Sequence, residues 1–196
     1  MFEELVSEKE KELRAKNLQE LRENLNSSDT ILKITNFCEK HGFSTEEIIQ
    51  RIKDDDFAAS VFAKDPSKQN FTEKLVAELL KVKTLPQSGK NCVRFNKEGD
   101  ICFTKTSETS KSADFVINNT FITQKYTRSA GGAQDNQYAD VVDFLVKGSK
   151  KHKVAAIVDG SYWDKKRKEL KDFFHSNPNV KILSMDDILV GGFLFE

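Results

Sequence analysis

The sequence predicts an α/β protein in which one mixed central sheet is flanked by helices and preceded by a helical N-terminal region. Three observations lead to this fold class. Residues 1–65 contain helical patterns and no strand-like run. Short β-rich runs separated by turn residues begin near residue 91. The C-terminal part then alternates helical patterns with apolar runs such as 154–158, which is typical of strands buried on both faces.

The N-terminal region is expected to hold three helices. Residues 2–25 form a charge-rich pattern with a partial stripe of leucines. Ser27, Ser28 and Asp29 are good caps for a helix over 30–40, which Gly42 would end. A capping-box pattern at 44–47 opens a third helix that runs to about Ile52.

The helices over 30–40 and 45–52 resemble a helix-turn-helix in outline. Two interpretations stay open, a DNA-reading helix at 45–52 or two helices of an ordinary bundle. Glu46 and Glu47 favour the bundle, because phosphate and base contacts favour basic or amide groups at the start of a recognition helix. We therefore expect residues 1–65 to be a helical region used for dimerisation or DNA contact, and residues 66–196 to form the second domain.

The second domain begins with a helix over about 67–83, placed after Pro66. Strands are expected next, and Asn118-Asn119 is a plausible tight turn between the last two of them. Helices over 135–146 and 163–175 then alternate with two strands, and a short helix begins at Asp186. The expected strands are 91–96, 99–104, 114–117, 120–127, 154–158 and 180–183.

Composition limits the functional classes. The formal net charge is zero, so attraction to nucleic acid would have to come from local basic patches. The N-terminus has no apolar signal core, and no run approaches the length of about 18 apolar residues that a membrane span needs. Cys38, Cys92 and Cys102 match no zinc-ligand spacing. We expect a cytoplasmic protein with no membrane partner.

The chemical signal lies around two strands. Asp114 precedes the apolar run 115–117, and Lys125 lies near the end of the following strand. A carboxylate here can bind Mg²⁺, which polarises a phosphate, and a neighbouring lysine can orient the attacking water. Strand alternation places Thr123 and Lys125 on one face and Gln124 on the other.

The order of motifs over about residues 110–196 resembles the FokI-type branch of the PD-(D/E)xK restriction endonucleases. The matching segments are SADFVI at 112–117, ITQKY at 122–126, the Gly131-Gly132 loop with Gln137 on the next helix, AIVDG at 156–160 and ILSMDDILVGG at 182–192. The resemblance implies a restriction-endonuclease-like fold, Mg²⁺ as cofactor, Asp114 as metal ligand and Lys125 as catalytic lysine.

One position departs from the family pattern, because Thr123 stands where an Asp or Glu is expected. Gln124 is one candidate replacement, provided that a bulge turns its side chain to the site. Glu78 is another, as a metal ligand from the preceding helix. On a helical wheel that starts at Phe71, Leu75, Leu79 and Val82 form an apolar stripe that includes Glu78, whereas Glu73 falls on the opposite face. The alternative is that Glu78 lies at the rim of the stripe and reaches solvent.

DNA contacts are expected from two segments. Gln134, Asn136 and Gln137 follow the glycine loop and could donate hydrogen bonds to base edges or backbone. The alternative is an ordinary glycine loop that precedes a capped helix. Lys150 and Lys151, in a basic run, could hold phosphates, although most charge runs are simply solvated.

The functional expectation is a type II restriction-type endonuclease that hydrolyses double-stranded DNA as a homodimer, since one site of this size makes one cut. Three alternatives remain. Thr123 would fit a catalytically degenerate DNA-binding subunit. A repair or recombination nuclease would prefer branched DNA. An interaction protein would depend on the helix over 2–25.

Overall fold

The structure is a computed structural model that describes residues 1–128 and 134–191. It is a mixed α/β protein with an N-terminal helical region, as the sequence predicts. The chain divides into two compact units, a helical unit over Glu4–Phe71 and a sheet unit that combines Met1–Glu3 with Thr72–Glu196. The division lies at Phe71 and Thr72, whereas the sequence placed it between residues 65 and 66.

Four α-helices account for most of the helical unit. They are α1 (Phe2–Glu23), α2 (Ser28–His41), α3 (Thr45–Asp54) and α4 (Asp56–Phe62), followed by a 3-10 turn at Pro66–Lys68. The expected caps form, because the Ser27 and Ser44 side chains accept from the backbone of Thr30 and Glu47. Helix α4 was not predicted, and Asp55 both ends α3 and caps α4.

Buried side chains from α1 to α4 form the core of the helical unit. They are Leu21, Leu25, Ile34, Cys38, Ile48, Ile52 and Ala59. Ile34 and Ile52 are fully enclosed, so the two helices of the helix-turn-helix outline are packed by their apolar faces into this bundle.

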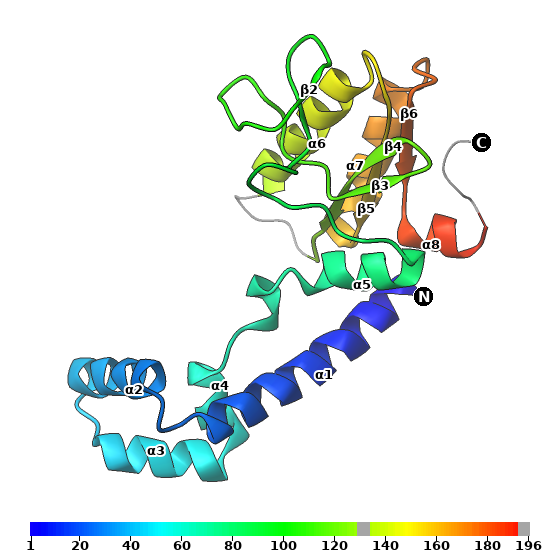
Figure 1. The fold of residues 1–196 in the computed structure, drawn as a ribbon. Coiled ribbons are helices and arrows are strands. Elements are labelled where there is room, and N and C mark those ends of the chain that lie inside the picture. Colours follow the sequence, from blue (N-terminus) through cyan, green and yellow to red (C-terminus); the bar gives the residue numbers. More distant parts are fainter. Residues whose placement is uncertain (129–133, 192–196) are drawn as a thin grey trace. The chain divides into compact units, whose positions relative to one another are not determined.

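The sheet unit begins with α5 (Phe71–Leu80) and a two-stranded antiparallel sheet of β1 (Arg94–Phe95) and β2 (Ile101–Cys102). The main sheet has four strands in the order β3 (Phe115–Ile117), β4 (Thr120–Tyr126), β5 (Lys153–Asp159) and β6 (Val180–Leu183). Helices α6 (Gln134–Gly148) and α7 (Ser161–Phe173) connect its last three strands, and α8 (Met185–Leu189) follows β6 (Figure 1).

The main sheet is mixed, as predicted. Strands β3 and β4 form an antiparallel hairpin, whereas β4, β5 and β6 run parallel. Asn118 and Asn119 make the hairpin turn with φ of 48° and 58°, which asparagine tolerates better than most residues. The parallel strands therefore end at one edge of the sheet, where Lys125 lies near the end of β4.

Helices α6 and α7 pack on one face of the main sheet. Val141, Phe144 and Leu145 of α6 and Trp163 and Leu170 of α7 join the strands in one core. Register pairs Phe121, Thr123 and Lys125 of β4 with Val154, Ala156 and Val158 of β5, and all three β5 residues belong to this core. Thr123 and Lys125 thus share the face on which α6 and α7 pack.

Two expectations about the sheet unit are wrong in detail. The strands near residues 91–104 form a small separate sheet and do not join the main one. The helix expected over 67–83 spans only Phe71–Leu80, because Lys81 adopts a φ of 54° that ends it. Over residues 1–128 and 134–191, no helix combines the length and apolar character that crossing a membrane requires.

Candidate functional site

Asp114 lies at the start of β3 and is almost fully enclosed, with 3% of its surface exposed. The backbone N–H of Gln124 donates to its Oδ2 atom at 2.6 Å, and the Thr123 hydroxyl donates to the same atom at 3.2 Å. The Nε2 atom of Gln87 donates to Oδ1 at 2.7 Å. These three hydrogen bonds fix the position of the Asp114 carboxylate. Its Oδ1 atom carries fewer of these bonds and has lone-pair capacity left.

Lys125 meets Asp114 as the strand pattern predicted. Its Nζ atom lies 3.8 Å from Asp114 Oδ2, and 27% of its side chain is exposed. The Lys125 side chain is therefore close to the buried Asp114 carboxylate and also reaches solvent, on the sheet face that α6 and α7 cover.

Gln124 does not supply a side chain to this group. Its register with Ile157 is unbroken, so no bulge turns it, and alternation puts its side chain on the face opposite Lys125. The carboxamide is buried and its Nε2 atom has no hydrogen-bond partner. Gln124 contributes through its backbone N–H only, which corrects the expectation of a replaced acid.

Glu73 of α5 is the second carboxylate of the group, and sequence reasoning missed it. Burial raises the pKa of the Glu73 carboxyl first of all, and the negative charge of Asp114 raises it further. The positive charge of Lys125 and a hydrogen bond from the Gln87 side chain act against this rise. Half-buried Glu73 is thus electrostatically coupled to both predicted residues, Asp114 and Lys125.

Glu78 was predicted to occupy the buried side of the same helix, and this expectation is wrong because its side chain is exposed. The wheel gave weight to Val82, which lies beyond the end of α5. It also ignored Val76 and Ala77, which are buried and lie at about 140° and 240° when Phe71 is zero. Glu73, at about 200°, falls between them.

The group fits one small divalent cation. It holds two carboxylates and one lysine, so an extra positive charge would relieve the repulsion that raises the pKa of Glu73. Mg²⁺ is commonly bound by one or two carboxylates while it keeps several waters. Among the described residues, no group of three or more His, Cys, Asp or Glu side chains is placed to hold a metal ion, so the fit rests on the two carboxylates of Asp114 and Glu73.

The amide residues expected to contact DNA have different surroundings. Gln137, on the first turn of α6, accepts a hydrogen bond from the Thr127 hydroxyl at 2.9 Å, and Trp163 donates to the same hydroxyl. This bond ties α6 to the end of β4. Asn136 is exposed. The Gly131-Gly132 loop and the side chain of Gln134 lie outside the described residues.

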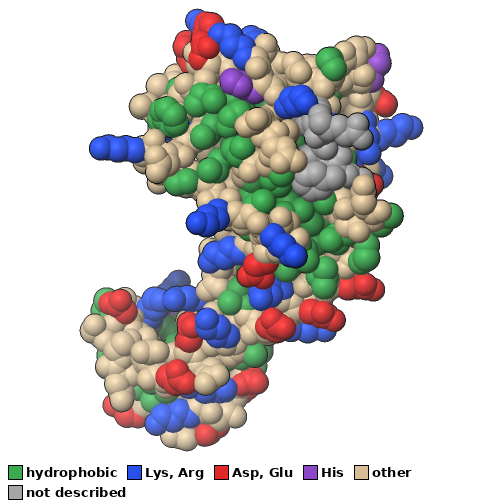
Figure 2. Space-filling view, turned by 45° about the vertical axis from the view of Figure 1, so that its right-hand side comes forward, with side chains coloured by type: hydrophobic (Ala, Val, Ile, Leu, Met, Phe, Trp, Pro, Cys, Tyr) green, Lys and Arg blue, Asp and Glu red, His purple; other side chains and the backbone are tan. Residues whose placement is uncertain are grey.

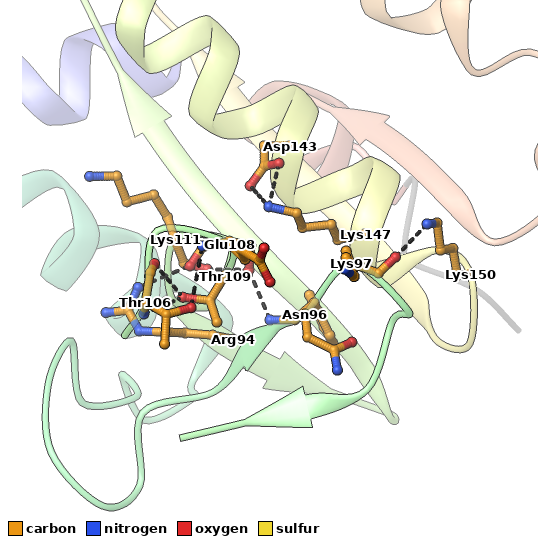
Figure 3. A network of polar contacts seen from close by, with 12 residues as sticks. Arg94, Asn96, Lys97, Thr106, Glu108, Thr109, Lys111, Asp143, Lys147 and Lys150 are labelled. Carbon is orange, nitrogen blue, oxygen red and sulfur yellow. Dashed lines mark hydrogen bonds and ion pairs between the residues drawn. The ribbon is translucent and has the colours of Figure 1, made fainter. Parts of the chain in front are cut away.

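Lys150 and Lys151 lie just before β5, at the end of the sheet opposite Lys125. Lys151 pairs with Asp100, and Lys150 donates to the backbone carbonyl of Lys97. Lys147 of α6 pairs with Asp143, and Figure 3 shows the Lys147 and Lys150 contacts beside the β1–β2 hairpin. Lys150 and Lys151 thus bind the turn of the hairpin to the segment before β5, and their position gives no support to a phosphate contact at the Asp114 group.

Asp159 is a further buried acid, at the end of β5, and sequence reasoning gave it no role. Only 5% of its surface is exposed, and burial raises its pKa to about 7. Both carboxyl oxygens accept from the Met185 N–H, at 3.1 and 3.2 Å. Asp159 pairs in register with Tyr126, so it faces away from Lys125 and holds the start of α8.

The two units differ in charge. The helical unit has 11 Lys and Arg against 14 Asp and Glu, whereas the sheet unit has 20 against 17. Figure 2 shows acidic and basic side chains intermixed over the helical unit. This balance disfavours the helical unit as the main phosphate-binding surface.

We find no family model, curated protein or solved structure that matches this chain. The family resemblance over residues 110–196 therefore stays a prediction.

Proposed function

We propose that the sheet unit is a Mg²⁺-dependent nuclease that hydrolyses phosphodiester bonds of double-stranded DNA at Asp114, Glu73 and Lys125. One observation carries the proposal. The Asp114 carboxylate lies 3.8 Å from the Lys125 ammonium, and burial, followed by the negative charge of Asp114, raises the pKa of the Glu73 carboxyl. A divalent cation would offset the repulsion between the two acids, so the arrangement suits a site that binds such an ion.

Each of the three residues would have a separate role in hydrolysis. Asp114, fixed by the Gln124 N–H and Thr123, would hold the cation through Oδ1, with Glu73 as second ligand. Lys125, held near Asp114 and partly open to solvent, would orient the attacking water and offset negative charge on the phosphate. When bound, Mg²⁺ would supply Lewis-acid activation of the phosphate and a more acidic water.

Glu73 replaces the acid that the family pattern places at Thr123. Thr123 is 1% exposed and its hydroxyl donates to Asp114, so this position holds a hydrogen-bond donor in place of an acid. The second carboxylate comes from Glu73 of α5. In this proposal the departure at Thr123 relocates a ligand without removing the activity.

The expected restriction-type action requires further features that we propose with it. A double-strand cut by one small site implies a homodimer, and the acidic helical unit suits protein contacts better than phosphate contacts. We expect that unit to dimerise and the sheet unit to contact the duplex.

A DNA-binding subunit without activity is the second candidate, and Thr123 is the observation that favours it. A pair formed by Asp114 and Lys125 at 3.8 Å could then be structural. This alternative does not explain why Glu73 lies where the charges of Asp114 and Lys125 act on its carboxyl.

The test is digestion of a long unmethylated duplex with and without Mg²⁺, using wild type, Asp114→Asn and Lys125→Met. Discrete fragments that need Mg²⁺ and vanish in both variants would support a sequence-specific nuclease. A preference for branched over plain duplex would indicate a repair-type nuclease. A gel shift of intact DNA with no cleavage under Mg²⁺ or Mn²⁺ would contradict the proposal and favour the binding subunit.

A further inference from the structure

Gln87 contacts the candidate site from the loop between α5 and β1. Its Nε2 atom donates to Asp114 Oδ1 at 2.7 Å, and its side chain also acts to lower the pKa of the Glu73 carboxyl. Gln87 therefore interacts with both proposed ligands. No feature of the family resemblance predicted a role for this residue.

The loop holds Gln87 firmly although the residue itself is exposed. Arg94, with 6% of its surface exposed, donates to the Gln87 carbonyl at 3.0 Å. The N–H of Leu85 donates to the Asp114 carbonyl at 2.8 Å. The backbone of the loop is thus fixed on both sides of the glutamine, while its carboxamide reaches the carboxylates.

Ser112 decides which end of the carboxamide faces Asp114. Its hydroxyl donates to Gln87 Oε1 at 2.7 Å, which leaves Nε2 for the carboxylates. A serine hydroxyl can accept as well as donate. After a half-turn of the carboxamide, Ser112 would accept from Nε2, and Oε1 would stand beside Asp114 Oδ1, where a cation could bind both oxygens.

The spacing suits two oxygen ligands of one Mg²⁺ ion. Metal–oxygen distances of about 2.0–2.1 Å at right angles put neighbouring ligand oxygens about 2.9 Å apart. The present separation between Gln87 Nε2 and Asp114 Oδ1 is 2.7 Å. Without a cation, two oxygens at this distance would repel, and so the amide donor faces the carboxylate.

We propose that Gln87 is the third protein ligand of the cation, through Oε1, and that its carboxamide turns over when the ion binds. This inference rests on the proposed Mg²⁺ site and deepens it. A neutral third ligand adds an oxygen to the two carboxylates of Asp114 and Glu73 and adds no further charge to the site.

The test is titration of Mn²⁺ and of Mg²⁺ into the full chain by calorimetry near about pH 8, where carboxylates are ionised. The variants are Gln87→Leu, Gln87→Glu, Asp114→Asn and, as a control, Gln50→Leu from α3. Urea unfolding confirms that each variant folds. Water-proton relaxation of bound Mn²⁺ reports how many waters coordinate the ion.

Gln87→Leu is expected to bind Mn²⁺ about ten-fold more weakly, which corresponds to about 1.4 kcal/mol, and to add one coordinated water. Gln87→Glu, which can only accept, is expected to bind at least as tightly as wild type. Gln50→Leu is expected to bind like wild type. A Gln87→Leu variant that binds as wild type or tighter, while Asp114→Asn weakens binding, overturns the ligand role of Gln87 alone. Binding that is absent in wild type, or that Asp114→Asn leaves unchanged, overturns the metal site and this inference together.

Discussion

Substituting Asp159 by asparagine should stabilise the protein above neutral pH. Asp159 is buried at the end of β5, and burial raises its pKa from 3.8 to about 7. Asparagine keeps the shape and one acceptor for the Met185 N–H, while it removes the charge that is costly to bury. The nearby positive charge of Arg167 offsets only part of that cost.

The magnitude follows from the two pKa values. Between about pH 4 and 7 the folded state keeps a proton that the unfolded state has lost, so wild-type stability falls as pH rises through this window. Above pH 7 Asp159 is ionised in both the folded and the unfolded state, and the folded state then bears the full free-energy cost of burying its charge. A difference of about three units, at 1.36 kcal/mol each, gives an upper value of about 4 kcal/mol. The Met185 N–H keeps one of its two acceptor oxygens in the variant, so we expect a gain of about 2–4 kcal/mol.

The assay is urea unfolding of wild type and Asp159→Asn in steps from about pH 4 to 8. Trp163, the only tryptophan, is fully buried and reports unfolding of the sheet unit by its fluorescence. Asp172→Asn, an exposed aspartate of α7, is the control.

The expected result is a difference in unfolding free energy that is near zero at pH 4 and reaches its full value by pH 8. The Asp172→Asn difference should stay flat. The reasoning is refuted if Asp159→Asn is equally stable at both ends of the range, or if it loses stability as pH rises.

Two further changes test the surroundings of the site. Gly160→Ala should cost more than about 3 kcal/mol, because Gly160 has a φ of +95° and an added Cβ would lie 2.3 Å from the Thr127 carbonyl oxygen. Gly89→Ala, with a φ of +87° and open space around it, should cost only about 1–2 kcal/mol in the same urea assay. Equal losses would mean that the contact with Thr127 is unimportant. Thr123→Asp places a third carboxylate beside Asp114 and should cost about 3–5 kcal/mol in EDTA, with partial recovery in millimolar Mg²⁺ because a cation binds only the folded state. No difference between EDTA and Mg²⁺ would count against a cation at this place.

Local patterns explain most of the fold that the sequence predicted. Capping residues such as Ser27 and Ser44 act within one helical turn, and the Asn118-Asn119 turn is decided by backbone preference alone. The continuous apolar run of β5 is a direct consequence of burial on both faces. Helix α4 was missed because one residue, Asp55, separates it from α3, and no Gly or Pro marks the break.

The site was predicted in part. Asp114 and Lys125 meet because a tight hairpin fixes their register, which strand alternation can describe. Glu73 and Gln87 arrive from a helix and a loop that pack on the sheet unit, and no local pattern specifies such contacts. The Gln87 bond to Asp114 spans 27 positions of the chain. The prediction that Glu78 lies on the buried side failed because the helical wheel included Val82, whereas α5 ends at Leu80.

The most direct test of the proposed site compares two glutamates of α5. Glu73→Gln removes a carboxylate coupled to Asp114, whereas Glu78→Gln removes an exposed one from the same helix. We expect single-turnover cleavage of duplex DNA in Mg²⁺ to fall at least about 100-fold for Glu73→Gln, within the range seen for groups that stabilise a transition state. Glu78→Gln should cleave as wild type. Equal activity of the two variants, with both folded, would contradict a hydrolytic site formed by Asp114, Glu73 and Lys125.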